Sequence, residues 1–287
     1  MGLNLGGGST TSNFNALQLG NAQSLLSKSL MRLSSGQRIN RPSDDPGGLA
    51  VSMKLSHAYT VASATKNNVD NALSFTDTQD SALESAASIL DRMSTIKTTY
   101  SGSAVLSSTE KSSYASEFKE LQKQLSSFES ETFNSLSLFS TTANSKSVYT
   151  STKGSGGASI SVSSLNLTSA LSISSGAASR NLANATGSVT ISSVSISDLT
   201  SAISSVASLR ATSGATASRL QFSSDFLATS KTNLKAANSR IMDVDVADEV
   251  TNYAKYNVQV YAASAALAQS NLNMGIVLDL LNFNGSR

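Results

Sequence analysis

Residues 247–272 read ADEVTNYAKYNVQVYAASAALAQSNL, and their pattern indicates one long amphipathic helix. Small and apolar side chains recur there at intervals of three and four residues. They form a seam made of Ala247, Val250, Ala254, Val258, Tyr261, Ala265, Ala268 and Leu272. No Asp, Glu, Lys or Arg occurs from residue 256 to residue 278, although a surface helix normally carries a charged face. The opposite face holds Ser, Asn, Gln and Ala, which tolerate burial against other helices better than Lys or Glu do.

The beginning of the chain combines the same helical pattern with the same lack of charge. Residues 1–27 contain no Asp, Glu, Lys or Arg. The three-four spacing is kept by Leu19, Ala22, Leu26, Leu30 and Leu33. A monomer has too little other chain to cover two such ends. We therefore infer that other copies of the protein cover them and that the protein functions by assembly.

The composition limits the cellular compartment and the classes of partner that suit this protein. The net charge is +2 and charged residues make up 14% of the chain, which favours neither nucleic acid nor a membrane surface as a partner. Cysteine is absent, which excludes thiol chemistry and disulfides and suits an exported protein. The first residues lack a basic region followed by an apolar run, and no run of about 18 apolar residues occurs. We expect export without a cleaved signal peptide.

Two prolines in one loop divide the N-terminal helical part. In the loop 40–48, Pro42 disfavours helix at the preceding residue, whereas Pro46 suits the first turn of a new helix. Ser43, Asp44 and Asp45 are the candidate caps of that helix. Apolar spacing then predicts one helix over about 49–100 and another through residues 114–128. On the C-terminal side, Leu199, Val206, Leu220, Leu227, Leu234 and Ile241 keep a seven-residue register, which favours packing in a helical bundle.

Residues 141–197 have a different character, rich in Ser and punctuated by Gly. Alternating patterns at 159–163 and 188–197 predict short strands in hairpins. The expected fold is mainly α: a long antiparallel coiled coil or helical bundle rod with its N- and C-termini paired, plus a small β-hairpin insertion. The Ser and Thr side chains of the insertion are either ordinary polar residues or acceptors of O-linked sugars.

Two motifs at opposite ends of the chain point to a family. The stretch SLMRLSSGQRIN (29–40), followed by Asp44-Asp45 and Gly48-Leu49-Ala50, closely resembles the N-terminal signature of bacterial flagellins. Phe133-Asn134 is similar to the mark that closes their N-terminal half. AANSRIMDVDVADE (236–249), together with LAQSN (267–271) and VLDLL (277–281), resembles their C-terminal half. The Gly-rich start does not match the usual opening, and RPSDDP (41–46) is closer to the hook–filament junction protein, a relative of flagellin.

The resemblance implies a structural subunit of the extracellular flagellar filament, in a minimal form without the outer variable domains. It implies an inner core coiled-coil domain over 1–43 and 244–287, and a helical rod domain over 44–140 and 198–243 with 141–197 as its insertion. The implied partners are further copies of the chain, other flagellins, hook-associated and cap proteins, and an export chaperone. The hook–filament junction protein is the alternative within the family, and a secreted adhesin or binding module is the alternative outside it.

The assembly interface expected from the seams, the joint and the resemblance spans both ends of the chain. Lys28, Arg32, Arg38 and Arg41 face Asp243, Asp245, Asp248 and Glu249 if the ends run antiparallel, which would fix helix register; the alternative is that these are ordinary solvated charges. The expected interface residues are Leu19, Leu26, Leu30, Arg32, Leu33, Arg38, Ile39, Arg41, Asp44, Asp45, Arg240, Asp243, Asp245, Val250, Val258, Tyr261, Leu267, Leu272, Leu280 and Leu281.

The resemblance also implies a contact with a vertebrate innate immune receptor at Arg92 and Ile96. The third, acidic position of that contact falls on Ser116, with Glu117 adjacent, so we expect weak activation.

No pattern in the sequence supports catalysis or a cofactor. His57 is the only histidine, the Ser-x-x-Lys matches are no more than such a Ser-rich chain yields by chance, and the acidic residues 243–249 lack the glycine of a calcium loop. We expect no enzyme, no metal and no cofactor.

Overall fold

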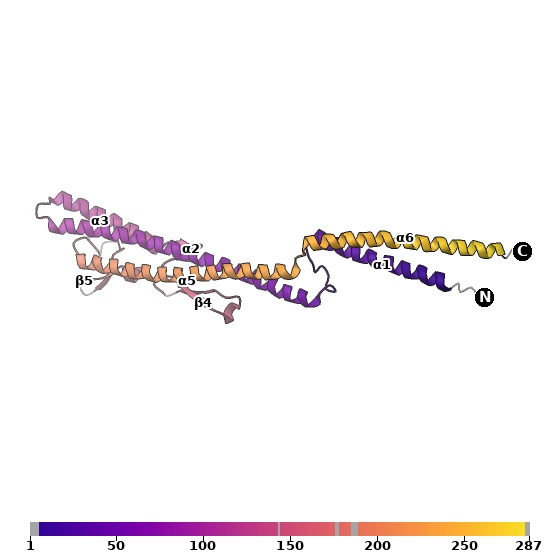
Figure 1. Ribbon diagram of the computed structural model, residues 1–287. Coiled ribbons are helices and arrows are strands. Elements are labelled where there is room, and N and C mark those ends of the chain that lie inside the picture. Colours follow the sequence, from indigo (N-terminus) through magenta and orange to yellow (C-terminus); the bar gives the residue numbers. More distant parts are fainter. Residues whose placement is uncertain (1–5, 143, 176–177, 185–188, 285–287) are drawn as a thin grey trace. The chain divides into compact units, whose positions relative to one another are not determined.

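The computed structural model describes residues 6–142, 144–175, 178–184 and 189–284, and its architecture is mainly α-helical (Figure 1). The long helices are α1 (Gly6–Ser35), α2 (Pro46–Gly102), α3 (Ser108–Glu129), α5 (Ile196–Met242) and α6 (Val246–Asn284). Two compact units divide the chain. The terminal unit comprises Met1–His57 with Leu234–Arg287, and the middle unit comprises Ala58–Asn233.

Helix α2 begins where the proline loop predicts. Asp45 caps it, because its carboxylate accepts a hydrogen bond of 2.8 Å from the amide of Gly48. Pro46 is the first helical residue, where its missing N–H costs no hydrogen bond. The next helix, α3, starts with a capping box between Ser107 and Glu110. The sequence therefore placed both helices correctly to within a few residues.

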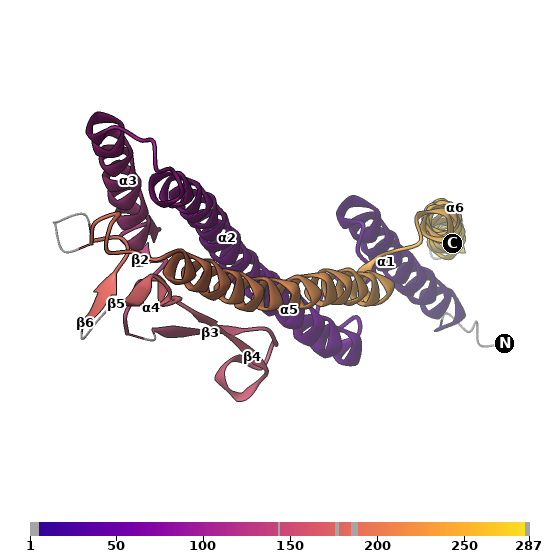
Figure 2. The same ribbon diagram turned by 90° about the vertical axis from the view of Figure 1, so that its left-hand side faces the viewer.

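The middle unit buries apolar side chains of α2, α3 and α5, and Figure 2 shows how these helices are arranged. On α2, the buried apolar residues include Val69, Leu83, Ala86, Leu90 and Met93, and Leu73 is half-buried. On α5, the seven-residue register is confirmed, since Leu199, Val206, Leu220 and Leu227 are buried. Ser213 occupies the same register and is also buried, and its hydroxyl donates to the carbonyl of Thr76 at 3.3 Å.

Small antiparallel hairpins follow α3 and precede α5 along the chain. The strands are β1 (Thr132–Phe133), β2 (Leu136–Ser137), β3 (Ser145–Tyr149), β4 (Ser159–Ser163), β5 (Ser172–Ser175) and β6 (Ala178–Asn181), which pair as β1–β2, β3–β4 and β5–β6. A 3₁₀ turn (Gly154–Gly156) and the short helix α4 (Leu167–Ala170) complete the region. In β1–β2, both turn residues have positive φ, 48° at Asn134 and 64° at Ser135, as in the tightest hairpin turns.

One predicted strand is correct and one is wrong. Residues 159–163 form β4 as expected. Residues 189–195 form turns and irregular structure, residue 188 lies outside the described residues, and Ile196 already begins α5. The alternation there reflects burial without strand pairing, because Val189, Ile191 and Val194 enter the core.

Polar side chains from the helices hold the insertion by its main chain. The Nε2 amide of the buried Gln79 donates to the carbonyls of Leu138 and Ser163, at 2.7 and 3.3 Å. Gln122 donates in the same way to the carbonyls of Leu182 and Val189, at 3.0 and 3.2 Å. Lys97 donates to the carbonyl of Ile191 at 2.8 Å. These bonds give main-chain oxygens of this region hydrogen-bond partners inside the protein.

Candidate assembly surface

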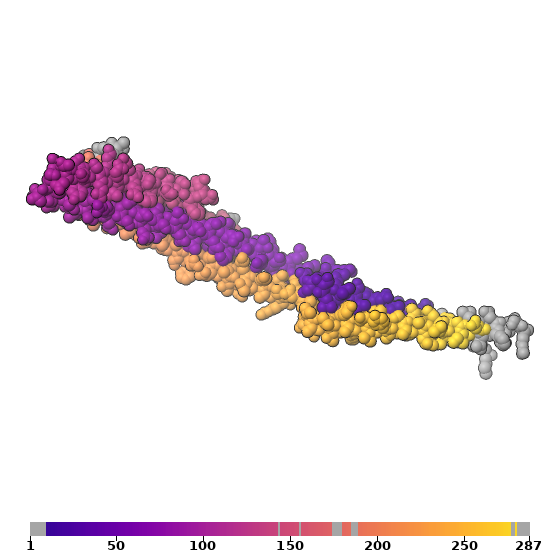
Figure 3. Space-filling view, turned by 90° about the horizontal axis from the view of Figure 1, so that it is seen from above, coloured from indigo at the N-terminus to yellow at the C-terminus, as the bar shows by residue number. Residues whose placement is uncertain are grey.

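In the terminal unit, α1 and α6 pack side by side in antiparallel directions (Figure 3). The Ser12 hydroxyl donates to the Asn271 side chain at 3.1 Å, and the Ser29 hydroxyl donates to the carbonyl of Glu249 at 3.3 Å. Residue numbers therefore rise along one helix as they fall along the other. The two ends of the chain lie together, as the sequence predicted.

The apolar seam of α6 faces away from α1. Every seam residue from Ala247 to Leu272 is exposed, with Val258 at 67% and Tyr261 at 71%. The face that packs toward α1 is more polar, and its buried or half-buried members are Glu249, Asn252, Tyr253, Tyr256, Asn257, Val260, Ala263, Leu267, Ser270 and Met274. Among the described residues of the single chain, none covers this most apolar stripe of the helix.

Helix α1 also has an outward apolar face. Leu19, Ala22, Leu26 and Leu33 from the predicted seam are buried or half-buried, whereas Leu30 is 55% exposed. Phe14, Leu17 and Leu25 are also exposed. The seam analysis missed these three, although the absence of charge before residue 28 was the signal that could have found them. A contiguous exposed apolar surface of this kind marks an interaction site.

The joint between the helices is held by short backbone pairing. Gly36 has a φ of 70°, which favours glycine because other side chains clash there. The amide of Arg38 donates to the carbonyl of Met242 at 2.6 Å, and the amide of Val244 donates to the carbonyl of Gly36 at 3.1 Å. Asp245 caps α6 by accepting from the amide of Ala247 at 3.0 Å.

Asp44 is the centre of the loop between α1 and α2. Its carboxylate binds Lys28 Nζ at 2.7 Å and accepts hydrogen bonds from the amides of Arg41 and Asn40, at 3.1 and 3.3 Å. The hydrogen bond from Lys28, assisted by those amides, lowers the pKa of Asp44 to about 2. Asp44 is therefore ionised near pH 7, and the loop keeps the ion pair with Lys28 and the two amide hydrogen bonds at that pH.

The expected charge clusters meet at one point only among the described residues. Arg32 on α1 and Glu249 in the first turn of α6 approach to 3.6 Å, and Glu249 is 5% exposed. Lys28 and Arg38 pair instead with Asp44 and Asp45 of their own loop. The loop folds back on α1 and places its own carboxylates nearer than those of α6. Within one chain, only the Arg32–Glu249 pair joins the two clusters, and contacts of the other charges between copies stay a prediction.

The remaining expected interface residues fall into three groups. Ile39 is buried at 3%, and Leu267 is half-buried, so both stabilise the single chain. Side chains free to reach another molecule belong to Leu30, Arg41, Arg240, Asp243, Asp245, Val250, Val258, Tyr261 and Leu272, and Arg38 is also exposed. Leu280 and Leu281 belong to α6, but their side chains lie outside the described residues.

Of the two residues expected to contact the immune receptor, one lies on the surface and the other lies in the core. Arg92 is exposed and its guanidinium binds Glu117 on α3 through Nε at 2.8 Å and also through Nη2. Ile96 is 1% exposed, inside the packing of the middle unit. A partner approaching this face meets Arg92 and Glu117, while the side chain of Ile96 is out of reach.

Other kinds of site find little support. Within the described ranges, no group of three His, Asp or Glu side chains is arranged to hold a metal ion. Among those same residues, no helix has both the length and the hydropathy needed to cross a bilayer. The surface chemistry is that of a protein interface.

Comparisons with known proteins give matches in both halves of the chain. Residues 9–144 match the bacterial flagellin N-terminal helical region, and residues 176–281 match the bacterial flagellin C-terminal helical region. A flagellin of Bacillus subtilis is 30% identical over 297 aligned residues, which cover 92% of this chain and 95% of the relative. A flagellin of Listeria innocua is 29% identical, covering 88% of this chain and 90% of the relative. The flagellar filament 33 kDa core protein of Treponema phagedenis is 28% identical, covering 92% and 94%.

The two matched regions leave only residues 145–175 between them, so the chain has no large variable domain. Paired terminal helices, an outward apolar seam and matches over both halves of the chain lead to one assignment: this chain belongs to the bacterial flagellin family.

Proposed function

We propose that this protein is the structural subunit that polymerises into the extracellular flagellar filament used for swimming. The observation that carries the proposal is the outward seam of α6, with Val250, Val258, Tyr261 and Leu272 all about half or more exposed. The relatives described above are flagellins and a filament core protein, which favours the filament over the hook–filament junction alternative.

Burial of the seam supplies the free energy for assembly. Each large apolar side chain that leaves water contributes about 1.5–3 kcal/mol before the cost of association is subtracted. The outward faces of both terminal helices carry such side chains, so one subunit can contact several neighbours. Because α1 already covers the more polar face of α6, a further copy is needed to cover the seam.

In this proposal the inner core domain comprises residues 1–43 and 244–287. The rod domain comprises 44–140 and 198–243, with 141–197 inserted. Hook-associated proteins, the cap and an export chaperone are proposed as partners from family membership.

Electron microscopy after addition of a precipitating salt tests the proposal. The full chain is expected to form long filaments, whereas a version lacking residues 1–40 and 245–287 is expected to stay monomeric. Circular dichroism and thermal unfolding of the truncated version check that the middle unit still folds. A full chain that remains monomeric under every polymerising condition would overturn the proposal.

A further inference from the structure

The middle unit presents two aromatic side chains to solvent on α5. Phe222 and Phe226 are one helical turn apart and are 73% and 68% exposed. Both lie nearly opposite Ser224, because two residues along an α-helix turn by about 200°. The Ser224 hydroxyl donates to Asp70 of α2 at 2.7 Å, which fixes the side of α5 that meets α2. The two phenylalanines therefore point away from the core of their own chain.

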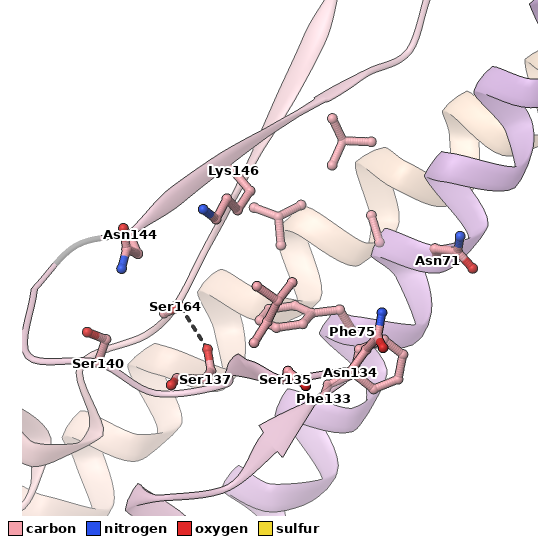
Figure 4. Close-up of a pocket in the computed structure, with 14 residues that line it drawn as sticks. Asn71, Phe75, Phe133, Asn134, Ser135, Ser137, Ser140, Asn144, Lys146 and Ser164 are labelled. Carbon is pink, nitrogen blue, oxygen red and sulfur yellow. Dashed lines mark hydrogen bonds between the residues drawn. The ribbon is translucent and has the colours of Figure 1, made fainter.

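The same unit has an apolar hollow of approximately 530 Å³ between α2 and the β1–β2 and β3–β4 hairpins (Figure 4). The rings of Phe75 on α2 and Phe133 on β1 meet edge to face at 6.1 Å and form part of its wall. Other apolar lining residues are Ala72, Leu136, Val148 and Val162. The volume lies within the range of about 300–1,000 Å³ that accepts drug-sized molecules, so aromatic side chains can enter.

Charges beside the two features are complementary. Asp225 lies between the two phenylalanines in sequence, and its carboxylate accepts a hydrogen bond of 3.0 Å from Gln221. Lys146 lines the hollow from β3. Among the described residues, neither Asp225 nor Lys146 has an oppositely charged group within 4.0 Å. An aromatic pair with a carboxylate thus matches an apolar hollow with an ammonium group at its rim.

We propose that Phe222 and Phe226 of one copy insert into the hollow of a second copy, with Asp225 beside Lys146 of that copy. The inference rests on the proposed function, because it names one contact by which subunits join. The phenylalanines face away from the core of their own chain and are not among the side chains lining its hollow, so a second molecule has to supply them. A contact between two different surfaces can repeat from copy to copy, and it builds an open helical polymer when its rotation does not close into a ring.

Substitution of the aromatic pair tests the apolar part of the contact. The double variant Phe222→Ser with Phe226→Ser is expected to raise the critical concentration for polymerisation by about 10- to 100-fold. Both side chains are exposed, so thermal unfolding of the monomer is expected to be unchanged. The matched control Phe222→Leu with Phe226→Leu keeps the apolar character and is expected to polymerise almost normally.

Exchange of the charges tests the orientation. Asp225→Lys alone and Lys146→Asp alone are each expected to raise the critical concentration by about two- to fivefold. A chain carrying both substitutions restores opposite charges in the same contact, so it is expected to return toward the original value. Lys119→Asp, an exposed position on α3, serves as the control for a charge change elsewhere.

Crosslinking gives a direct readout, because the chain contains no cysteine. One batch carries Phe226→Cys and a second carries Leu136→Cys, and the two are copolymerised and treated with a short bis-maleimide. A mixed dimer is expected on a denaturing gel from polymer and not from monomer. Val105→Cys, at an exposed position between α2 and α3, replaces Phe226→Cys in the control batch.

The results separate the two proposals. Filaments that form equally well from the serine double variant, or a crosslink no stronger than the Val105 control, would overturn this contact and leave the filament function intact. A native chain that never polymerises would overturn the proposed function itself.

Discussion

The terminal unit and the middle unit use their apolar side chains in opposite ways. In the middle unit, leucines and isoleucines of α2, α3 and α5 close a core that the single chain completes. In the terminal unit, Ala22 and Ile39 are the only described hydrophobic residues that are buried, while large side chains from Phe14 to Ile276 remain exposed. The difference shows that the middle unit closes a core with its own side chains, whereas the terminal unit leaves most of its large apolar side chains in solvent. In the proposed function, neighbouring copies cover those exposed side chains of the terminal unit.

The largest loss of polymerisation is expected from placing charges on the outward seam of α6. Val258→Asp with Tyr261→Asp is expected to abolish filaments, because each substitution removes about 1.5–3 kcal/mol of apolar burial and adds a charge to the contact. Sedimentation and electron microscopy measure the loss. Val258→Ile with Tyr261→Phe is the control that keeps the seam apolar. Polymer formation by the aspartate variant would show that the seam does not contact other copies.

Truncating one leucine in each unit compares the two parts directly. Leu90→Ala, in the core of the middle unit, is expected to lower the free energy of unfolding of the monomer by about 2–5 kcal/mol. Leu30→Ala, on an exposed face of α1, is expected to change monomer stability by less than about 0.5 kcal/mol while weakening polymerisation. Chemical denaturation and critical concentration are the two measurements. A large loss of monomer stability in Leu30→Ala would contradict the comparison.

Acid is expected to loosen the terminal unit through Asp44. A carboxyl whose pKa is depressed on folding contributes stability above its unfolded pKa and loses it as pH falls toward the folded pKa. For Asp44 this window runs from 3.8 down to about 2. Hydrogen exchange of the loop 40–48 should therefore be protected at neutral pH and lose protection within the window. Lys28→Met, which removes the main cause of the shift, should move the loss to higher pH.

Two left-handed positions allow a smaller, paired test. Ser135 has a φ of 64° in the middle unit, and Gly36 has a φ of 70° in the terminal unit. Ser135→Gly is expected to stabilise the middle unit by about 1 kcal/mol, and Gly36→Ala to destabilise the joint by a similar amount. A Cβ at Gly36 would meet no atom within 4 Å, so conformation alone sets the cost. Thermal unfolding and protease sensitivity of the joint provide the readouts, and equal signs for the two changes would contradict this explanation.

The smallest expected effect concerns the exposed arginines of the joint. Arg38→Glu with Arg41→Glu is expected to impair polymerisation modestly, because exposed ion pairs contribute about 0–1 kcal/mol each. The middle unit should stay folded by circular dichroism. Lys235→Glu, which changes another exposed charge of the terminal unit, is the control. Normal filaments from the double variant would show that these charges are merely solvated.

Helical periodicity made most of the fold predictable from the sequence. The seven-residue register of α5 and the proline-marked start of α2 both follow from local rules, and the structure confirms them. The strand predicted at 188–197 failed because a buried alternating segment can have its carbonyls bound by Gln122 and Lys97 instead of by another strand.

Parts of the candidate site were less predictable. The uncharged ends revealed that α1 and α6 meet other helices, but not which face of α6 takes α1. That choice depends on pairwise packing, which favours the face with Tyr253 and Tyr256 over the more regular seam. Within one chain, only Arg32 and Glu249 join the two charge clusters, because the loop that carries Asp44 and Asp45 folds back on α1 and binds Lys28 and Arg38.

The hydrogen bonds that Gln79, Gln122 and Lys97 make to the insertion have a consequence for its evolution. The hydrogen bonds that these three side chains donate go to main-chain oxygens, which every amino acid carries. Outward-facing residues of the insertion can therefore be replaced without loosening its attachment. Such a surface is free to change its appearance to antibodies, phages or sugar-transferring enzymes while the helices beneath it stay the same.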